Sequence, residues 1–164
     1  MRLGELDSAA ARFARTHFHP RWAERVVAAY SRTGEHALCW FALGAGGAAV
    51  DPARRSRWLR GTQIVAAAYV VNYGVKLAVR RPRPEFPGLP DLTPTVSRLS
   101  FPSAHATTSF AAARAYRGLV PARVLYAAAF GFMLSRPYLG VHYPGDVLAG
   151  AALGTAIAEI GVRL

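Results

Sequence analysis

The sequence predicts an all-α integral membrane protein, a bundle of about five transmembrane helices preceded by an amphipathic helix at the membrane interface. Hydrophobic residues make up 52% of the chain, and they gather in uncharged stretches rich in alanine and glycine. Prolines and arginine clusters separate these stretches, as expected where helices end and loops begin. The 164 residues, without an evident linker, have the size of one domain. Within it we distinguish an N-terminal segment, residues 1–32, and a helical bundle, residues 35–164.

The first third of the chain predicts an interfacial segment and one spanning helix. Between residues 3 and 30, apolar residues recur at roughly helical spacing among arginines, and Pro20 divides this segment into two short pieces. Residues 37–50 are uncharged and rich in glycine and alanine, which favours a first membrane helix. The basic stretch 51–57 is the expected connecting loop. No cleavable signal peptide is expected, because charged residues interrupt the start of the chain.

The rest of the chain predicts four further helices. Residues 61–79 form the second spanning helix, which should stop at the prolines of residues 81–84. A non-helical loop follows over residues 85–102, and three of its apolar side chains contact either a lipid tail or the loop itself: Phe86, Leu89 and Leu92. The last three helices are expected at residues 104–119, 121–135 and 144–164. In the last helix Gly150 and Gly154 form a small face suited to close helix packing.

The length of the apolar runs opposes the membrane interpretation. No uncharged run exceeds fifteen residues, whereas a spanning helix needs about 20 predominantly apolar positions. The runs reach spanning length if terminal arginines extend their long stems toward the headgroups: Arg60, Arg80 and Arg123. We keep the membrane interpretation on that ground, with a soluble protein as the alternative. Arginines occur on both expected faces, so the positive-inside rule does not decide the orientation.

Charge and composition narrow the possible functions. The net charge of +11 would suit a nucleic-acid-binding protein, but the basic residues are dispersed through a hydrophobic chain, so no nucleic-acid partner is expected. The nine acidic residues are scattered and form no metal-ligand pattern with histidine or cysteine. We therefore expect neither a metal nor another cofactor. The single cysteine, Cys39, lies in an apolar run and is interpreted as a small buried hydrophobic residue.

One short stretch, residues 134–150, has the composition of half an active site. Arg136 offers a planar fork of donors suited to phosphate. His142 and Asp146 stand four residues apart, a spacing at which a carboxylate orients an imidazole. Ser103 is placed to start the helix at residue 104, where a capping hydroxyl and free backbone amides bind anions. A surface loop before a capped helix would have the same local pattern, so the interpretation depends on the other motifs.

Three motifs occur together in a fixed order. They read Lys-x6-Arg-Pro from Lys76, Pro-Ser-x-His ending at His105, and Ser-Arg-x5-His-x3-Asp ending at Asp146. On these residues the chain resembles the type-2 phosphatidic acid phosphatase superfamily, which contains membrane lipid phosphatases, soluble acid phosphatases and vanadium haloperoxidases. The resemblance covers nearly half of the chain. One departure is visible, since Ala104 replaces the usual glycine of the second motif, and its methyl group could crowd an amide that approaches phosphate.

The resemblance implies a role for each motif residue. His142 corresponds to a nucleophile that forms a phosphohistidine, Asp146 orients its ring, and His105 is the general acid. The phosphate oxygens would be held by cations, a hydroxyl and a backbone amide: Lys76, Arg83, Ser103, Ala104 and Arg136. Three cations and a helix terminus are sufficient charge to replace the metal ions that many phosphatases use.

The resemblance further implies a lipid phosphate as substrate and the bacterial cell membrane as location. Short members rich in alanine and arginine resemble actinobacterial enzymes of cell-envelope synthesis, which favours polyprenyl diphosphate or decaprenylphosphoryl-5-phosphoribose. Phosphatidylglycerophosphate and phosphatidic acid are the alternatives within the enzyme class, and a non-catalytic membrane interaction protein is the alternative outside it.

Glu35 and His36, before the first spanning helix, form either a solvated cap or a contact to a polar headgroup. The oligomeric state stays open.

Overall fold

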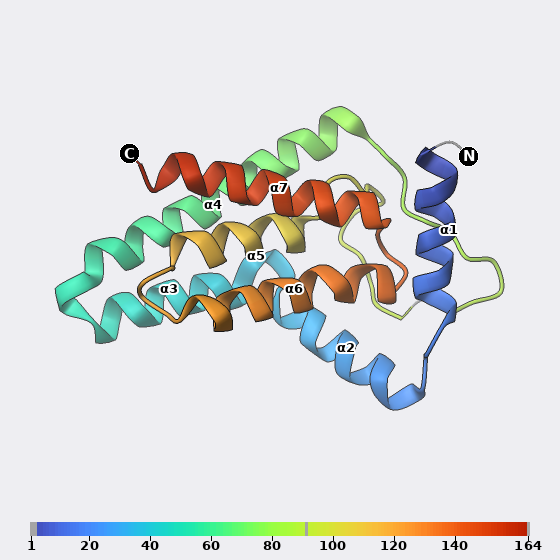
Figure 1. Ribbon diagram of the computed structural model, residues 1–164, viewed down its shortest axis with the longest axis horizontal. Helices are drawn as coiled ribbons and strands as arrows, with labels where there is room; N and C mark the ends of the chain where they lie inside the picture. The colour runs from blue at the N-terminus through green and yellow to red at the C-terminus, as the bar shows by residue number, and fades with distance from the viewer. Residues whose placement is uncertain (1–2, 91, 164) are drawn as a thin grey trace.

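The structure is a computed structural model that describes residues 3–90 and 92–163. These residues form seven α-helices and two short 3₁₀ turns, with a long non-helical loop between the fourth and fifth α-helices (Figure 1). The elements, in order, are α1 (Leu3–Thr16), α2 (Arg21–Thr33), η1 (Glu35–Ala37), α3 (Leu38–Val50), η2 (Pro52–Arg54), α4 (Arg55–Val79), α5 (Ala104–Ala115), α6 (Ala122–Tyr138) and α7 (Pro144–Gly161).

The N-terminal segment consists of two helices, as its periodicity predicts. Helix α2 begins directly after Pro20, whose fixed φ suits a residue preceding a helix. Both helices leave large apolar side chains exposed, among them Phe13 and Trp22, which are 62% and 64% exposed. An amphipathic helix with an exposed apolar face is typical of a membrane interface.

Three predicted boundaries are wrong. Helix α4 begins at Arg55 and not at residue 61, because Asp51 and Pro52 complete the turn and no helix breaker follows them. The Trp58 indole stabilises this start by donating to Asp51 Oδ2 over 3.1 Å. Helix α5 ends at Ala115, four residues early, before a turn in which Gly118 has a φ of +85°. Helix α6 continues through Pro137 to Tyr138, and the carbonyls of Ser135 and Pro137 accept from the two amides that follow the helix.

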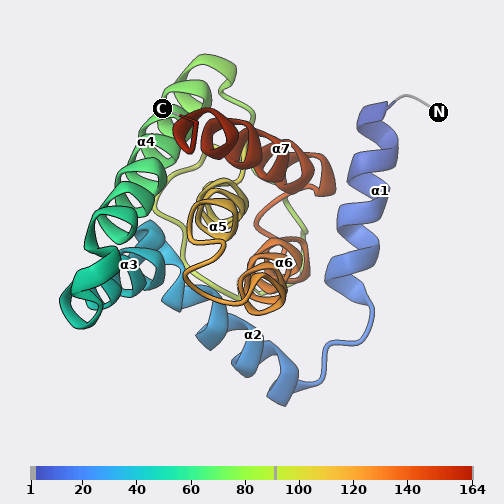
Figure 2. The same ribbon diagram turned by 60° about the vertical axis from the view of Figure 1, so that its left-hand side comes forward.

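Helix α5 is the centre of the bundle (Figure 2). Residues 106–113 of this helix are all buried, and α4, α6 and α7 surround it. The small face of α7 permits its close contact with α5, as predicted. A Cβ atom added at Gly154 would lie 2.0 Å from the Thr107 carbonyl oxygen, and one at Gly150 would lie 2.6 Å from that of Ser103. Larger residues at either position would push α7 away from α5.

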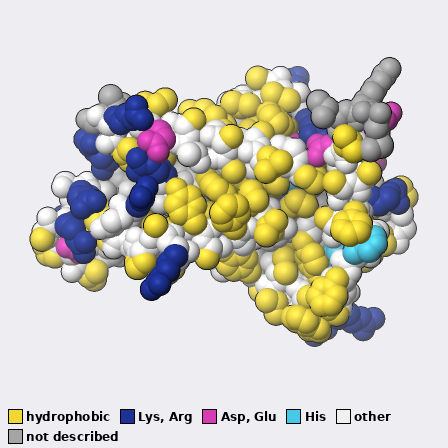
Figure 3. Space-filling view, viewed as in Figure 1, with side chains coloured by type: hydrophobic (Ala, Val, Ile, Leu, Met, Phe, Trp, Pro, Cys, Tyr) yellow, Lys and Arg dark blue, Asp and Glu magenta, His cyan; other side chains and the backbone are white. Residues whose placement is uncertain are grey.

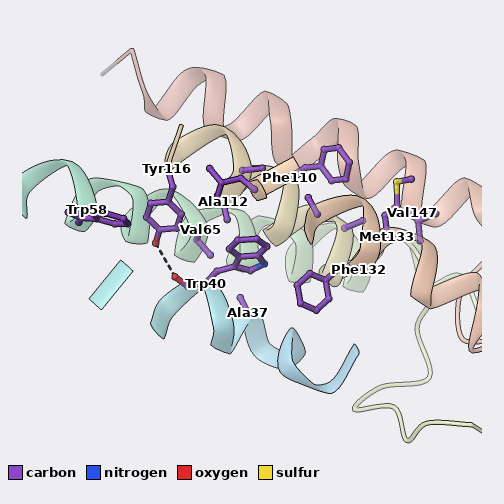
Figure 4. Packing of buried hydrophobic residues seen from close by; sticks show 14 of the residues in the cluster. Ala37, Trp40, Trp58, Val65, Phe110, Ala112, Tyr116, Phe132, Met133 and Val147 are labelled. Atoms are coloured by element: carbon purple, nitrogen blue, oxygen red, sulfur yellow. Dashed lines mark hydrogen bonds between the residues drawn. The ribbon is translucent and has the colours of Figure 1, made fainter. Parts of the chain in front are cut away.

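Aromatic side chains fill the core between α3, α4, α5 and α6 (Figure 4). The Trp40 indole donates to Ser109 Oγ over 2.9 Å, and the Tyr116 hydroxyl donates to the Trp40 carbonyl over 3.1 Å. Each buried polar atom of these large side chains therefore has a partner, which removes the cost of burying it.

The two ends of the bundle differ. Helix α1 and the long loop lie at one end, and the α3–α4 and α5–α6 connections lie at the other (Figure 1). Among the described helices, only the segment Pro52–Val79 is long and apolar enough to cross a membrane by length and composition. The 12 residues of α5 rise about 18 Å, less than the roughly 30 Å of a hydrocarbon core. These lengths do not by themselves give the five spanning helices that the sequence predicts.

Candidate active site

The three sequence motifs meet in one cavity of about 100 Å³. The walls come from η1, α4, the long loop, the start of α5, the end of α6 and the turn before α7. Six of the eight predicted site residues line it: Lys76, Arg83, Ala104, His105, Arg136 and His142. The other two lie directly behind this lining, since Ser103 precedes Ala104 and Asp146 contacts His142.

Asp146 contacts the Nδ1 side of the His142 ring, as the four-residue spacing predicts. Its Oδ2 lies 3.4 Å from His142 Nδ1, and the same oxygen accepts from the Tyr143 amide over 2.9 Å. Asp146 stands in the first turn of α7, where the helix dipole stabilises a negative charge. Its side chain is fully buried. The imidazole therefore has a fixed carboxylate on its Nδ1 side.

Arg83 determines which nitrogen of His142 carries the proton. Its Nη1 donates to the Val141 carbonyl over 2.6 Å and lies 3.2 Å from His142 Nε2. A guanidinium has donors only, so Nε2 of the ring must be the acceptor. The proton then sits on Nδ1 and faces Asp146. His142 is thus a neutral imidazole whose lone pair points toward a cation on the cavity wall.

Burial supports the same protonation state. Loss of hydration lowers the pKa of His142 well below its ordinary value, and three nearby cations act in the same direction: Arg136, Arg83 and Lys76. The hydrogen bond with Asp146 opposes them, but burial is the largest influence. A histidine with this protonation state is a competent nucleophile at neutral pH.

His105 faces the cavity from the first turn of α5. Its Nε2 lies 3.0 Å from the backbone carbonyl of Ser31 on α2. A carbonyl only accepts, so Nε2 carries a proton and Nδ1 is the nitrogen free to exchange one. Gly34 also approaches this ring closely, since a Cβ atom there would lie 3.1 Å from His105 Cδ2. The α2–α3 connection therefore forms the wall beside His105.

Two buried polar atoms near the cavity have no hydrogen-bond partner among the described residues. They are Ser103 Oγ and Arg136 Nε. Ser103 stands at the N-cap position of α5, but its hydroxyl makes no capping bond, which corrects the prediction of a capping hydroxyl. Arg136 uses Nη1 to donate to Ser31 Oγ. An unsatisfied donor in a buried site is costly unless a ligand completes it, and phosphate oxygens would accept from both groups.

Lys76 uses its three donors on the chain itself. Its Nζ donates to the carbonyls of Leu99, Ser100 and Pro102 over 3.0, 3.3 and 3.1 Å. The ammonium group therefore fixes the segment that leads into α5 and also places a positive charge at the cavity. The sequence predicts the charge but not the contact with the loop.

Four further residues hold this site together, and the sequence did not identify them. Arg81 donates to Asp146 Oδ1 over 2.9 Å and to Asp7 Oδ2 over 2.8 Å. Ser100 Oγ donates to Asp146 Oδ2, and Ser31 contacts both Arg136 and His105. Arg81 and Ser100 adjoin motif residues and could have been suspected on that basis. Asp7 and Ser31 lie in helices α1 and α2, where no local pattern marks them.

The long loop lines the cavity with only part of its length. Residues 94–97 line the cavity, whereas Phe86 and Leu89 line a separate hollow beside Arg15 and Gly140. Leu92 packs against a small apolar cluster with Leu139. Of the two possibilities left by the sequence, packing within the protein therefore holds for Leu92.

Comparison with known proteins agrees with the three motifs. A model of the PAP2 superfamily matches residues 61–164. Decaprenylphosphoryl-5-phosphoribose phosphatase of Mycolicibacterium smegmatis is 47% identical over 127 residues, which cover 74% of this chain and 68% of that protein. The protein of the same name from Mycobacterium tuberculosis is 39% identical over 130 residues, covering 79% of this chain and 73% of its own.

A solved structure has the same fold. The transmembrane PAP2 type phosphatidylglycerolphosphate phosphatase from Bacillus subtilis superimposes with a TM-score of 0.80 at 23% identity, covering 98% of this chain and 85% of its own. The family match covers all three motifs and most of the bundle. The chain is therefore a member of the PAP2 superfamily of phosphatases.

Proposed function

We propose that this chain is a membrane phosphatase that removes the 5-phosphate from decaprenylphosphoryl-5-phosphoribose or a closely related polyprenyl-linked phosphoribose. The two mycobacterial relatives carry this activity in their names. The observation that supports the proposal most is the position of His142, whose Nε2 accepts from Arg83 in the wall of a cavity that also contains Lys76 and Arg136. This combination suits nucleophilic attack on a phosphate ester.

In the proposed reaction His142 Nε2 attacks phosphorus, the N–P bond forms, and the bond to the leaving alkoxide oxygen breaks. His105 Nδ1 takes up the proton that a monoanionic phosphate ester brings into the cavity and passes it to that oxygen, while Nε2 keeps its own proton and its hydrogen bond to the Ser31 carbonyl. Asp146 stabilises the positive charge that develops on the His142 ring. Water then attacks the phosphohistidine, His105 takes a proton from that water, and phosphate leaves.

The charge of the transition state is stabilised by groups of the chain. Arg83, Arg136 and Lys76 surround the cavity with positive charge, and Ser103 with the amide of Ala104 contributes the N-terminus of α5. A guanidinium binds two phosphate oxygens at once, so the arginines also orient the phosphate. Each of these phosphate-binding roles is part of the proposal.

We place the bundle in the bacterial cell membrane with about five of its helices embedded. The outer surface of its middle carries exposed apolar side chains, and arginines gather near the α3–α4 end (Figure 3). The exposed residues include Val70, Phe130 and Leu134, which are 68%, 47% and 62% exposed. Such a surface is unfavourable in water. Folded protein should require detergent for extraction from membranes, and its recovery in a detergent-free supernatant would contradict the placement.

The function is tested by phosphate release from a panel of lipids with purified protein. The panel contains prenylphosphoryl-5-phosphoribose, prenyl diphosphate, phosphatidylglycerophosphate and phosphatidic acid, each with and without excess EDTA. We expect the first substrate to have the highest kcat/KM, and activity to persist in EDTA because protein cations stabilise the phosphate charge. Vanadate should inhibit as a transition-state analogue.

Three other outcomes would each contradict a part of the proposed function. Preference for phosphatidylglycerophosphate or phosphatidic acid would replace the proposed substrate. Loss of activity in EDTA that magnesium restores would contradict the metal-independent mechanism. Release of phosphate from none of the four lipids would favour a non-catalytic interaction protein.

A further inference from the structure

Glu35 is a carboxylate placed in the wall of the phosphate cavity. It lines the same cavity as His105, Arg136 and His142. Its side chain is half-buried and makes no hydrogen bond or ion pair within the described residues, although it interacts electrostatically with Arg136. A carboxylate repels phosphate oxygens, so it does not help to bind the reacting phosphate itself. Its position needs another explanation.

The backbone around Glu35 is strained. His36 and Ala37 have φ angles of 50° and 59°, two successive left-handed residues without a glycine. This conformation is unfavourable for side chains with a Cβ atom, and such strain persists where the surrounding structure imposes it, often at functional sites. His36 is held in place by the Tyr69 hydroxyl, 2.9 Å from its Nδ1. The turn η1 therefore presents Glu35 and His36 to the cavity in a fixed arrangement.

Glu35 lies on the leaving-group side of the proposed reaction. In an in-line displacement the leaving oxygen departs opposite the attacking nitrogen, His142 Nε2. His105, which protonates that oxygen, contacts the α2–α3 connection through the Ser31 carbonyl and the Gly34 backbone. Glu35 directly follows Gly34. The group attached to the leaving oxygen therefore emerges beside this carboxylate.

The surrounding polar groups narrow the chemistry of that leaving group. Tyr69, Tyr73 and Thr95 add hydroxyl groups to the lining of the same cavity, and Tyr69 contacts His36, the residue after Glu35. Hydroxyls donate and accept, whereas an ionised carboxylate only accepts. A sugar with neighbouring hydroxyl groups fits such a set, and a carboxylate is a common acceptor for ribose hydroxyls. A second phosphate at this position would instead face the negative charge of Glu35.

We propose that Glu35, with His36 and Tyr69, forms a subsite for the hydroxyl groups of a sugar leaving group and disfavours a diphosphate. This inference deepens the proposed function and rests on it. The carboxylate of Glu35 would favour one substrate and disfavour the other. The sugar substrate gains a charged hydrogen bond, and the diphosphate substrate meets a like charge.

The test compares kcat/KM for three substrates: a short-chain prenylphosphoryl-5-phosphoribose, farnesyl phosphate and farnesyl diphosphate. Glu35→Gln keeps the side-chain shape and removes the charge, and Glu35→Ala removes both. We expect kcat/KM for the ribosyl substrate to fall about 10- to 100-fold in Glu35→Gln, the range for loss of a hydrogen bond to a charged group. Farnesyl phosphate should change by less than about threefold, and farnesyl diphosphate should improve.

The matched control is Glu85→Gln, which removes an exposed carboxylate from the long loop outside this cavity. It should leave all three values within about twofold of the wild type. Tyr69→Phe, which releases His36, should lower only the value for the ribosyl substrate. Equal losses on all three substrates in Glu35→Gln would overturn the inference, because they would indicate that Glu35 only positions Arg136.

The wild-type values separate this inference from the proposed function. Wild-type protein that hydrolyses farnesyl phosphate but shows no preference for the ribosyl substrate would refute the sugar subsite and leave a lipid phosphatase. No hydrolysis of any of the three would refute both. Unchanged kinetics in both Glu35 variants would refute the subsite while the proposed function stands.

Discussion

His142→Ala should abolish phosphate release, with a loss on the order of 10⁴-fold or more, the effect of removing a nucleophile. The reason is geometric, since His142 Nε2 is the unprotonated nitrogen that faces the cavity cations. The same variant should lose acid-labile labelling of the protein by a radioactive phosphate substrate. Phosphate release is measured in detergent solution, and labelling is measured after a rapid denaturing quench.

Asp146→Asn should lower both signals by about 10²- to 10⁴-fold, because the amide no longer fixes the imidazole or stabilises its positive charge. Asp51→Asn is the matched control, since that carboxylate lies at the α3–α4 turn, where its hydrogen-bond partners among the described residues are Arg54 and Trp58. It should retain wild-type turnover. Labelling that survives in His142→Ala and disappears in His105→Ala would require the two histidine roles to be exchanged.

His105→Ala should have an effect that depends on the leaving group. With an alkoxide leaving group, loss of the general acid should lower kcat by about 10²- to 10⁴-fold. With p-nitrophenyl phosphate the loss should be much smaller, because p-nitrophenolate departs without a proton. The measurement is kcat for the lipid substrate and for p-nitrophenyl phosphate with the same protein preparation.

The control for this variant is His17→Ala, which removes an exposed histidine that directly follows α1 and stacks on Phe13. It should not change the ratio of the two rates. If His105→Ala lowered both rates equally, the ring would serve to position phosphate or α5 and not to transfer a proton. Melting temperatures of all variants distinguish such effects from loss of folding, because His105 also joins α5 to α2.

Local sequence patterns predicted most helices of the bundle. Prolines and uncharged runs located α2, α3 and α7 within a few residues, because helix breaking and apolar periodicity act over one or two turns. The errors occurred where no such signal exists. The start of α4 depends on the hydrogen bond from Trp58 to Asp51, and the end of α5 depends on a turn at Gly118.

The sequence by itself also determined the pair His142 and Asp146, since a four-residue spacing at a helix start brings the two side chains together wherever the helix lies. It did not determine what surrounds them. The contacts of Arg81 with Asp7 and of His105 with Ser31 each join residues 74 positions apart. No local pattern encodes such pairs, because they form only when α1 and α2 pack against the bundle. The protonation of His142 and the place of Glu35 in the cavity wall were therefore decided by tertiary structure, where burial and distant charges act together.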